Sequence, residues 1–329
     1  MTIRILANDG IDSTGKKLLE NAGMEVITNK VAQEDLAKEL LNYDGITVRS
    51  ATKVRKELID AVPNLKVIAR AGVGMDNIDV EYARSKGIRV INTPAASSIS
   101  VAELVFAHLF NISRNLALSN RKLIQDPSGN FNDIKKASSA GVELKGKTLG
   151  IIGFGRIGQE TAKIAFGIGM DVLAYDPYVE NVDLSIYLGK TAGEQRIKIA
   201  VKTVSKEEVM RNADFISLHV PFSAGDKPVI GDEEISTMKN GVGIVNCARG
   251  GAVNEAALLR GINSKKVAYA GLDVFENEPP VNTAVFGLDN ISVSAHIGAS
   301  TAEAQERIGI ELAEKIIEYF KETNSSQSA

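Results

Sequence analysis

The sequence predicts an α/β protein built from two doubly wound parallel-sheet domains. Short runs rich in valine and isoleucine, bounded by Gly, Asn or Pro, alternate with amphipathic segments, which is typical of strands and helices in a parallel sheet. The same alternation begins again near residue 147. The 329 residues also exceed what one hydrophobic core usually organises, so two domains are expected.

The first hundred residues contain five predicted strands, at residues 3–7, 24–28, 46–49, 66–69 and 88–91. The amphipathic stretches between them predict the helices that cover the sheet. One long helix is then predicted over residues 98–124, with Ser97 or Ser98 as its N-cap. The polar run 126–133 is expected to end it.

The second alternating unit contains six predicted strands, at residues 147–152, 171–175, 215–219, 243–247, 268–273 and 291–294. Residues 301–320 predict one amphipathic helix, and the polar tail 321–329 gives no reason to expect order. Strand and helix signals are mixed over residues 187–202, so that stretch receives no assignment.

Composition and charge exclude several classes of protein. The chain is 44% apolar and 24% charged, as ordinary globular proteins are, which excludes overall disorder, collagen and coiled coil. The net charge is −3 and no basic tract is present, so no nucleic-acid partner is expected. The sequence contains no apolar run as long as a membrane span and no signal-peptide core, which predicts a cytoplasmic protein without membrane contact.

The single cysteine, Cys247, lies at the end of a predicted strand. One cysteine excludes an intramolecular disulfide framework and a cysteine-rich zinc site, and no metal is expected. No surrounding motif would activate a thiolate, which argues against a cysteine nucleophile.

A glycine pattern follows the first strand of the second unit. Gly153, Gly155 and Gly158 form G-x-G-x-x-G between a predicted strand and an amphipathic segment. In that order, backbone N–H groups and the helix N-terminus can receive a pyrophosphate, and glycines permit its close approach. Asp176 ends the next strand, where a carboxylate can accept from both adenosine ribose hydroxyls and would repel a 2′-phosphate. The pattern therefore predicts NAD in preference to NADP.

Three histidines occur, and each has a different context. His108 falls in a helical apolar stripe, which favours a satisfied core histidine, whereas His219 ends a strand and is expected to line the cofactor crevice. His296 also ends a strand, and other strand ends carry Arg249 and the carboxylates of Glu276 and Glu278. Hydride transfer to a 2-keto acid needs a cation for the substrate and a proton donor, which Arg and His supply. A carboxylate beside the histidine would favour its charged form, but spacing does not choose between Glu276 and Glu278.

Taken together, these segments resemble the D-isomer-specific 2-hydroxyacid dehydrogenase family over nearly the whole chain. The residues that carry the resemblance are 48–54, 70–79, 92–94, 146–158, 245–251, 272–280 and 296–301. The resemblance implies that Arg249 binds and polarises the substrate, that His296 is the acid/base, and that Glu278 is its partner. It also implies a discontinuous flavodoxin-like substrate domain, residues 1–97 and 297–329, and a Rossmann NAD-binding domain, residues 98–296.

Further contacts are carried over from the family by position. Cofactor contacts beyond the three glycines are implied for Arg156, Ile157, Asp176, His219, Val220, Cys247, Ala248, Arg249, Asp273, His296, Gly298 and Ala299. Substrate contacts are implied for Arg49, Ser50, Arg70, Val73 and Gly74, in addition to Arg249 and His296. Family dimerisation implies a homodimer, with Lys135 or Lys136 adding charge to a neighbouring subunit's site.

Within the family, the similarity is greatest to the branch that oxidises D-3-phosphoglycerate in serine biosynthesis. Arg49 and Arg70 resemble arginines that hold the substrate phosphate, which favours 3-phosphohydroxypyruvate over glyoxylate or pyruvate. Residues 95–98 and 221–227 depart from the family pattern, and the sequence ends after one helix, where longer members continue into a regulatory domain. Little inhibition by serine through such a domain is therefore expected. Two alternatives stay open: a glyoxylate or hydroxypyruvate reductase, and an NAD(H)-sensing corepressor-like binding protein.

Overall fold

The chain folds as two compact units. The computed structural model describes residues 2–126, 131–223, 225–281 and 283–326. The first unit comprises Met1–Ser98 with Ala299–Ala329, and the second comprises Ile99–Gly298. The predicted boundaries, at 97/98 and 296/297, lie one and two residues from these.

The first unit contains a five-stranded parallel sheet of order β2-β1-β3-β4-β5. This order is the flavodoxin-like one, and it brings the carboxyl ends of all five strands to one edge. The strands are β1 (Arg4–Ala7), β2 (Glu25–Ile27), β3 (Gly45–Val48), β4 (Val67–Arg70) and β5 (Arg89–Asn92).

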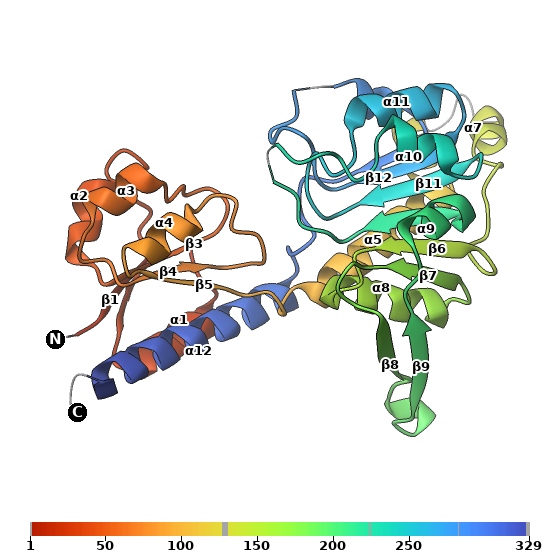
Figure 1. Ribbon diagram of the computed structural model, residues 1–329. Helices are drawn as coiled ribbons and strands as arrows, with labels where there is room; N and C mark the ends of the chain where they lie inside the picture. Colours follow the sequence, from red (N-terminus) through yellow and green to blue (C-terminus); the bar gives the residue numbers. More distant parts are fainter. Residues whose placement is uncertain (1, 127–130, 224, 282, 327–329) are drawn as a thin grey trace. The chain divides into compact units, whose positions relative to one another are not determined.

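Helices cover both faces of this sheet and enclose a separate core on each (Figure 1). One face packs against α1 (Ser13–Asn21) and the long α12 (Ala302–Ser326). These two helices can approach closely because Gly15 has no side chain; a Cβ there would meet the Gly309 carbonyl. The other face packs against α2 (Leu36–Glu39), η1 (Leu40–Asn42), α3 (Lys56–Ala61) and α4 (Val80–Ser85).

The second unit contains a six-stranded parallel sheet of order β13-β12-β11-β10-β6-β7. The strand order reverses between β6 and β10, which is the point where open α/β sheets bind nucleotides. The strands are β6 (Thr148–Ile152), β7 (Asp171–Tyr175), β10 (Phe215–Leu218), β11 (Val242–Asn246), β12 (Val267–Leu272) and β13 (Ile291–Val293).

Alternating side chains of these strands feed two cores. Residues such as Ile216 and Ile244 pack against α9 (Lys206–Asn212), α10 (Asp232–Thr237) and α11 (Glu255–Asn263). Phe215 and Val245 point to the opposite face, where α5 (Ser98–Ser113) and α8 (Arg156–Gly167) lie. The α/β class with two doubly wound parallel sheets is therefore the one that the sequence predicts.

The stretch that received no assignment, residues 187–202, forms the larger part of an antiparallel hairpin that begins at Asn181. Strands β8 (Asn181–Tyr187) and β9 (Arg196–Lys202) flank the short η2 (Lys190–Ala192). Figure 1 shows the hairpin extending away from the sheet of its own unit. Buried Leu184 and Val201 join its base to the core, and the N–H of Val204 then donates to the Ala174 carbonyl of β7.

Two predicted boundaries were wrong. The helix expected over 98–124 is broken into α5 and α6 (Leu116–Gln125), because Asn115 adopts a left-handed conformation with φ of 51°. The last helix continues to Ser326 instead of ending at residue 320, since each added residue gains one hydrogen bond once a helix is formed. Residues 127–130, inside the predicted 126–133 break, lie outside the described residues, and α7 (Phe131–Ala137) follows them.

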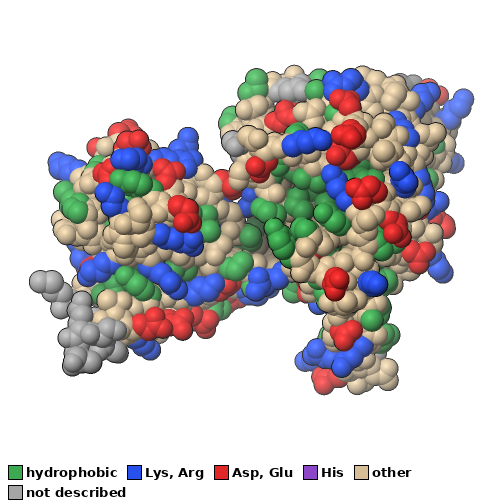
Figure 2. All heavy atoms as spheres, viewed as in Figure 1, with side chains coloured by type: hydrophobic (Ala, Val, Ile, Leu, Met, Phe, Trp, Pro, Cys, Tyr) green, Lys and Arg blue, Asp and Glu red, His purple; other side chains and the backbone are tan. Residues whose placement is uncertain are grey.

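Charged side chains of both signs are interspersed over the surface. On the face drawn in Figure 2, Lys and Arg alternate with Asp and Glu over both units, without a broad area of one sign among the described residues. None of the described helices combines the length and apolar character that crossing a membrane would require.

Candidate active site

The glycine loop connects β6 to α8 at the point of strand reversal. Gly153 has φ of 94°, and a Cβ there would lie 2.6 Å from the His219 carbonyl oxygen. A Cβ on Gly158 would meet the Gly153 carbonyl, whereas Gly155 has no neighbouring atom within 4 Å. The loop is therefore packed tightly against β10 but open at Gly155, which begins α8 without a side-chain cap. Arg156 and Ile157 are the first two residues of that helix.

Asp176 stands directly beside this loop. Its Oδ2 accepts from the Phe154 N–H at 2.7 Å and its Oδ1 from the Tyr178 N–H at 2.8 Å, which fixes the carboxylate at the end of β7. A carboxylate oxygen has two lone pairs, so each can accept a further hydrogen bond. The open loop, the uncapped helix N-terminus and the fixed acid together fit the pyrophosphate and ribose of NAD.

His219 and Val220 continue from β10 along the opposite side of the loop. The His219 N–H donates to the Ile152 carbonyl at 2.7 Å, and its Nε2 lies 3.0 Å from the Ser217 Oγ. The residue as a whole is partly exposed, but Nδ1 of the ring is buried without a hydrogen-bond partner. Burial lowers the pKa of His219 to about 3, so the ring is neutral at physiological pH and can line the crevice but not supply a proton.

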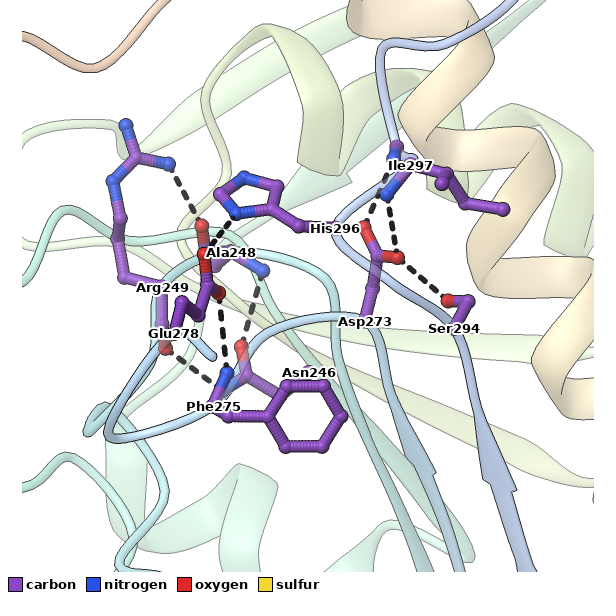
Figure 3. A network of polar contacts seen from close by, with 10 residues as sticks. Asn246, Ala248, Arg249, Asp273, Phe275, Glu278, Ser294, His296 and Ile297 are labelled. Atoms are coloured by element: carbon purple, nitrogen blue, oxygen red, sulfur yellow. Dashed lines mark hydrogen bonds and ion pairs between the residues drawn. The ribbon is translucent and has the colours of Figure 1, made fainter. Parts of the chain in front are cut away.

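Three predicted catalytic residues converge from three consecutive strand ends. Arg249 follows β11, Glu278 follows β12 and His296 follows β13, and Figure 3 shows their side chains gathered together. His296 Nδ1 lies 2.7 Å from Glu278 Oε2, and both side chains are about half exposed, at 48% and 39%. With Nδ1 held by the carboxylate, Nε2 is the nitrogen that can exchange a proton with a substrate oxygen.

The structure distinguishes the two glutamates that spacing left open. Glu276 Oε1 accepts from the Glu255 N–H at 2.9 Å, at the start of α11, while Glu278 contacts His296. The second oxygen of Glu278, Oε1, accepts from the Phe275 N–H at 3.3 Å.

Arg249 is held by a compact turn. Asn246, almost fully buried, donates through Nδ2 to the Arg249 carbonyl at 2.9 Å and accepts from the Ala248 N–H at 3.0 Å. Nη1 of Arg249 donates to the Ala248 carbonyl at 2.7 Å (Figure 3). A Cβ on Gly250 would meet the Phe275 carbonyl, so the glycine lets the β11 and β12 loops come together.

Asp273 lies beside the backbone of the segment that carries His296 (Figure 3). It is 1% exposed, and its oxygens accept from the N–H groups of Ile297 (2.8 Å) and Gly298 (2.9 Å) and from Ser294 Oγ (2.6 Å). Its own carbonyl accepts from the His296 N–H at 2.8 Å. These bonds support His296 in a left-handed conformation, φ 52°, that non-glycine residues seldom adopt. The contact with a cofactor that we predicted for Asp273 stays a prediction.

Cys247 is buried at the end of β11. Burial, reinforced by the Asp273 carboxylate, raises the pKa of its thiol well above the ordinary value. The thiol therefore has the opposite of the environment that activates a nucleophilic cysteine.

Five of the predicted substrate residues lie in the first unit, whereas Arg249 and His296 belong to the second. Arg49 directly follows β3, and Arg70 is the last residue of the neighbouring strand β4. Ser50, which is exposed, comes after Arg49. The Arg70 guanidinium lies over Gly72, where a Cβ would meet its Nη1. Val73 and Gly74 follow in the same loop, and the Val73 carbonyl accepts from Asn92 Nδ2 at 2.8 Å. In this unit Ala299 precedes α12, and its carbonyl accepts from Gln305 Nε2 at 2.7 Å.

Arg49 borders a cavity of about 280 Å³ that Asp9, Ala71 and Gln305 also line. The Asp9 Oδ2 accepts from the Arg49 N–H at 2.7 Å, and Asn77 Nδ2 donates to the Arg49 carbonyl at 2.9 Å. Sequence reasoning missed Asp9, Asn77 and the Asn246 turn. A short polar side chain at or just beyond the end of a strand, before a tight turn, is the signal that could have indicated Asp9 and Asn246. No cluster of three metal-ligating side chains occurs within the described residues.

Comparison with known proteins identifies the family. The profile described as "D-isomer specific 2-hydroxyacid dehydrogenase, NAD binding domain" matches residues 106–298. A hydroxypyruvate reductase of Thermotoga maritima is 45% identical over 97% of this chain and 98% of its own length. A D-3-phosphoglycerate dehydrogenase of Methanocaldococcus jannaschii is 41% identical over 95% of this chain, which spans 57% of that relative's length.

Solved structures agree. The NAD⁺-bound 3-phosphoglycerate dehydrogenase of Entamoeba histolytica superimposes with a TM-score of 0.76, at 28% identity, over 98% of this chain and 97% of that one. The chain therefore belongs to the D-isomer specific 2-hydroxyacid dehydrogenase family and is an NAD-dependent oxidoreductase.

Proposed function

We propose that this enzyme interconverts D-3-phosphoglycerate and 3-phosphohydroxypyruvate, with Arg249, Glu278 and His296 as its catalytic residues. The observation that carries the proposal is the pair of arginines, Arg49 and Arg70, at neighbouring strand ends of the first unit. Two guanidinium groups suit a phosphate dianion better than the neutral hydroxymethyl group of hydroxypyruvate.

The catalytic residues divide the work of the reaction. NAD, when bound, supplies the hydride chemistry. Arg249 binds the substrate carboxylate and polarises the reacting oxygen. During oxidation, His296 Nε2 takes the proton of the 2-hydroxyl group, and during reduction it returns that proton to the keto oxygen. Glu278, 2.7 Å from Nδ1, stabilises the imidazolium and keeps the ring in place.

Hydroxypyruvate reduction is the second candidate, and a specific observation favours it: the Thermotoga maritima hydroxypyruvate reductase is 45% identical over 97% of the chain. Both candidates use the same catalytic residues and differ only in whether the substrate carries a phosphate. The phosphate contacts therefore decide between them.

The test compares kcat/KM for NADH oxidation with 3-phosphohydroxypyruvate, hydroxypyruvate and glyoxylate. Arg49→Ala should lower the value for the phosphorylated substrate by about 10- to 100-fold, the loss of one charge-assisted hydrogen-bonded contact, and change the other two little. Arg89→Ala is the matched control, because this exposed arginine begins β5, at the opposite edge of the sheet. An equal loss for all three substrates would remove Arg49 from phosphate recognition, and preference for hydroxypyruvate in the unaltered enzyme would favour the second candidate.

The catalytic assignment has its own test. His296→Asn should lower kcat by about 10²–10⁴-fold while NADH binds almost as before, since it removes the proton donor and not the nucleotide site. Unchanged kcat would remove His296 from the mechanism. If the unaltered protein binds NADH but turns over none of the three substrates, the corepressor-like alternative gains support.

The reaction suggests a role in serine biosynthesis in the cytoplasm, and we propose a homodimer in which Lys135 or Lys136 reaches the neighbouring subunit's site. Light scattering coupled to size-exclusion chromatography measures the oligomeric state. Lys135→Ala and Lys136→Ala, assayed with 3-phosphohydroxypyruvate, test the contribution of each lysine.

A further inference from the structure

A buried histidine that is not among the proposed catalytic residues is connected by hydrogen bonds to the loop that carries His296. His108, in the middle of α5, is 3% exposed. Its Nδ1 lies 2.8 Å from Ser292 Oγ and its Nε2 lies 3.0 Å from Ser294 Oγ, and both serines belong to β13 or directly follow it. The ring reaches this position because β12 has a glycine opposite it: a Cβ on Gly271 would lie 2.7 Å from the His108 Cβ.

The surrounding bonds fix which nitrogen carries the proton. Asn111 Oδ1 accepts from the Ala117 N–H at 2.6 Å, so its Nδ2 faces Ser292 Oγ and donates to it at 2.7 Å. The Ser292 hydroxyl is then free to donate only to His108 Nδ1, which leaves the ring proton on Nε2. Nε2–H in turn donates to Ser294 Oγ, whose own hydroxyl donates to Asp273 Oδ1 at 2.6 Å.

The chain of bonds ends at the backbone of the catalytic histidine. The Asp273 carboxylate accepts from the N–H groups of Ile297 and Gly298, and the Asp273 backbone carbonyl accepts from the His296 N–H. Each hydrogen bond in this series donates in the same direction, from Asn111 on α5 toward the Asp273 carboxylate, so every donor between them has an acceptor. In a protonated ring both nitrogens would be donors, so the hydrogen bond between Ser292 and Nδ1 would have to reverse. Burial lowers the pKa of His108, which keeps the ring neutral.

We propose that His108 is a positioning residue, which holds Ser294 and Asp273 in register and thereby fixes the His296 loop for proton transfer. The proposal rests on the proposed role of His296 as acid/base. His108 does not touch that ring. Its effect passes through the Asp273 bonds that support the left-handed backbone of His296, and a catalytic group displaced by 1 Å can lose about 10²-fold in rate.

The test compares His108→Leu with His108→Gln. Leucine fills the site without any polar atom, whereas glutamine retains a donor that can reach Ser294. We expect His108→Leu to lower kcat about tenfold or more, with the Kd for NADH and the KM for the keto acid changed less than about threefold. His108→Gln should recover most of kcat. Counting NADH sites per chain keeps a misfolded fraction from being read as slower turnover.

A double-mutant cycle that combines His108→Leu with Ser294→Ala tests whether the effect of His108 passes through Ser294. Because His108 acts through Ser294, the double variant should lose no more kcat than the more affected single variant, whereas independent effects would multiply. Equal losses in His108→Leu and His108→Gln, lower thermal stability without loss of kcat, or multiplying losses would overturn the proposal. If His108→Leu fails to fold, the Gln variant and Ser294→Ala still report on it. His296→Asn separates the two hypotheses: unchanged kcat there refutes the acid/base role, whereas a large loss there with normal kcat in His108→Leu refutes only the positioning role.

Discussion

Replacing Asp273 by Asn should loosen the backbone around His296 while the shape of the side chain hardly changes. The carboxylate is 1% exposed and accepts from two backbone N–H groups and one hydroxyl. An asparagine offers one oxygen, so with that oxygen toward Ser294 and Ile297 its amide group faces the Gly298 N–H. The loss comprises a hydrogen bond to a charged group, about 1.5–3 kcal/mol, and a buried unpaired donor, about 1–3 kcal/mol, which overlap in part. Removing a buried charge offsets some of this.

We therefore expect the free energy of local opening to fall by about 2–4 kcal/mol, which corresponds to about 30-fold or more faster amide exchange at residues 294–298. Hydrogen–deuterium exchange followed by mass spectrometry, without cofactor, measures this directly. Glu276→Gln is the matched control, because it neutralises an exposed carboxylate that follows the same strand as Asp273. That carboxylate accepts from the Glu255 N–H at 2.9 Å. Its exchange at 294–298 should match that of the unaltered protein. Normal exchange in Asp273→Asn, together with weaker NADH binding, would refute the structural role and favour a cofactor contact alone.

Three other results are expected. Asp176→Ala should weaken NAD binding and reduce the difference in affinity between NAD and NADP in calorimetric titrations, because it removes the carboxylate that we predict to bind the ribose; a change in kcat alone would contradict this. The free energy of unfolding should fall as the pH drops below about 6.5, where an unfolded histidine takes up a proton. His219, whose pKa burial lowers to about 3, stays neutral, so it costs up to about 2 kcal/mol between pH 7 and pH 5, and His219→Gln should flatten the profile of denaturant unfolding over that range. Cys247 should react with iodoacetamide only after unfolding, and fast labelling of the folded protein would contradict its burial.

The strands of both sheets could be predicted because their signal is local. A strand buried on both faces reads as a short apolar run, and the helices between such runs carry their own period. The β8–β9 hairpin lacks this simplicity. Tyr187 and Ile197 are about half exposed, at 47% and 49%, while Leu184 and Val201 are buried, so its apolar residues do not mark a single buried face. The break after α5 is equally hidden, since Asn115 turns the chain without any glycine or proline.

The catalytic candidates could be located, but not fully interpreted, from their place at strand ends. Parallel strands bring their carboxyl ends to one edge, which is why Arg249 and His296 could be expected near each other. Choosing Glu278 over Glu276 depends on the path of an irregular loop, in which one carboxylate turns to α11 and the other to His296. No periodicity exists in such a loop from which the direction of a side chain could be read.

The role of the buried network depends on combining a local rule with a distant contact. Along β12, Ala270 and Leu272 belong to the core beneath α11, so alternation places Gly271 and Asp273 on the opposite face. That parity is readable in the sequence, but the helix that covers this face is 160 or so residues earlier in the chain, and only the fold shows that His108 sits against Gly271. A histidine in an apolar stripe therefore reads as core filling until the sheet beneath it is known. Gly271 leaves room for the ring, and the two flanking serines give both ring nitrogens a partner. Through Asp273, the second of these serines is linked to the loop that carries His296.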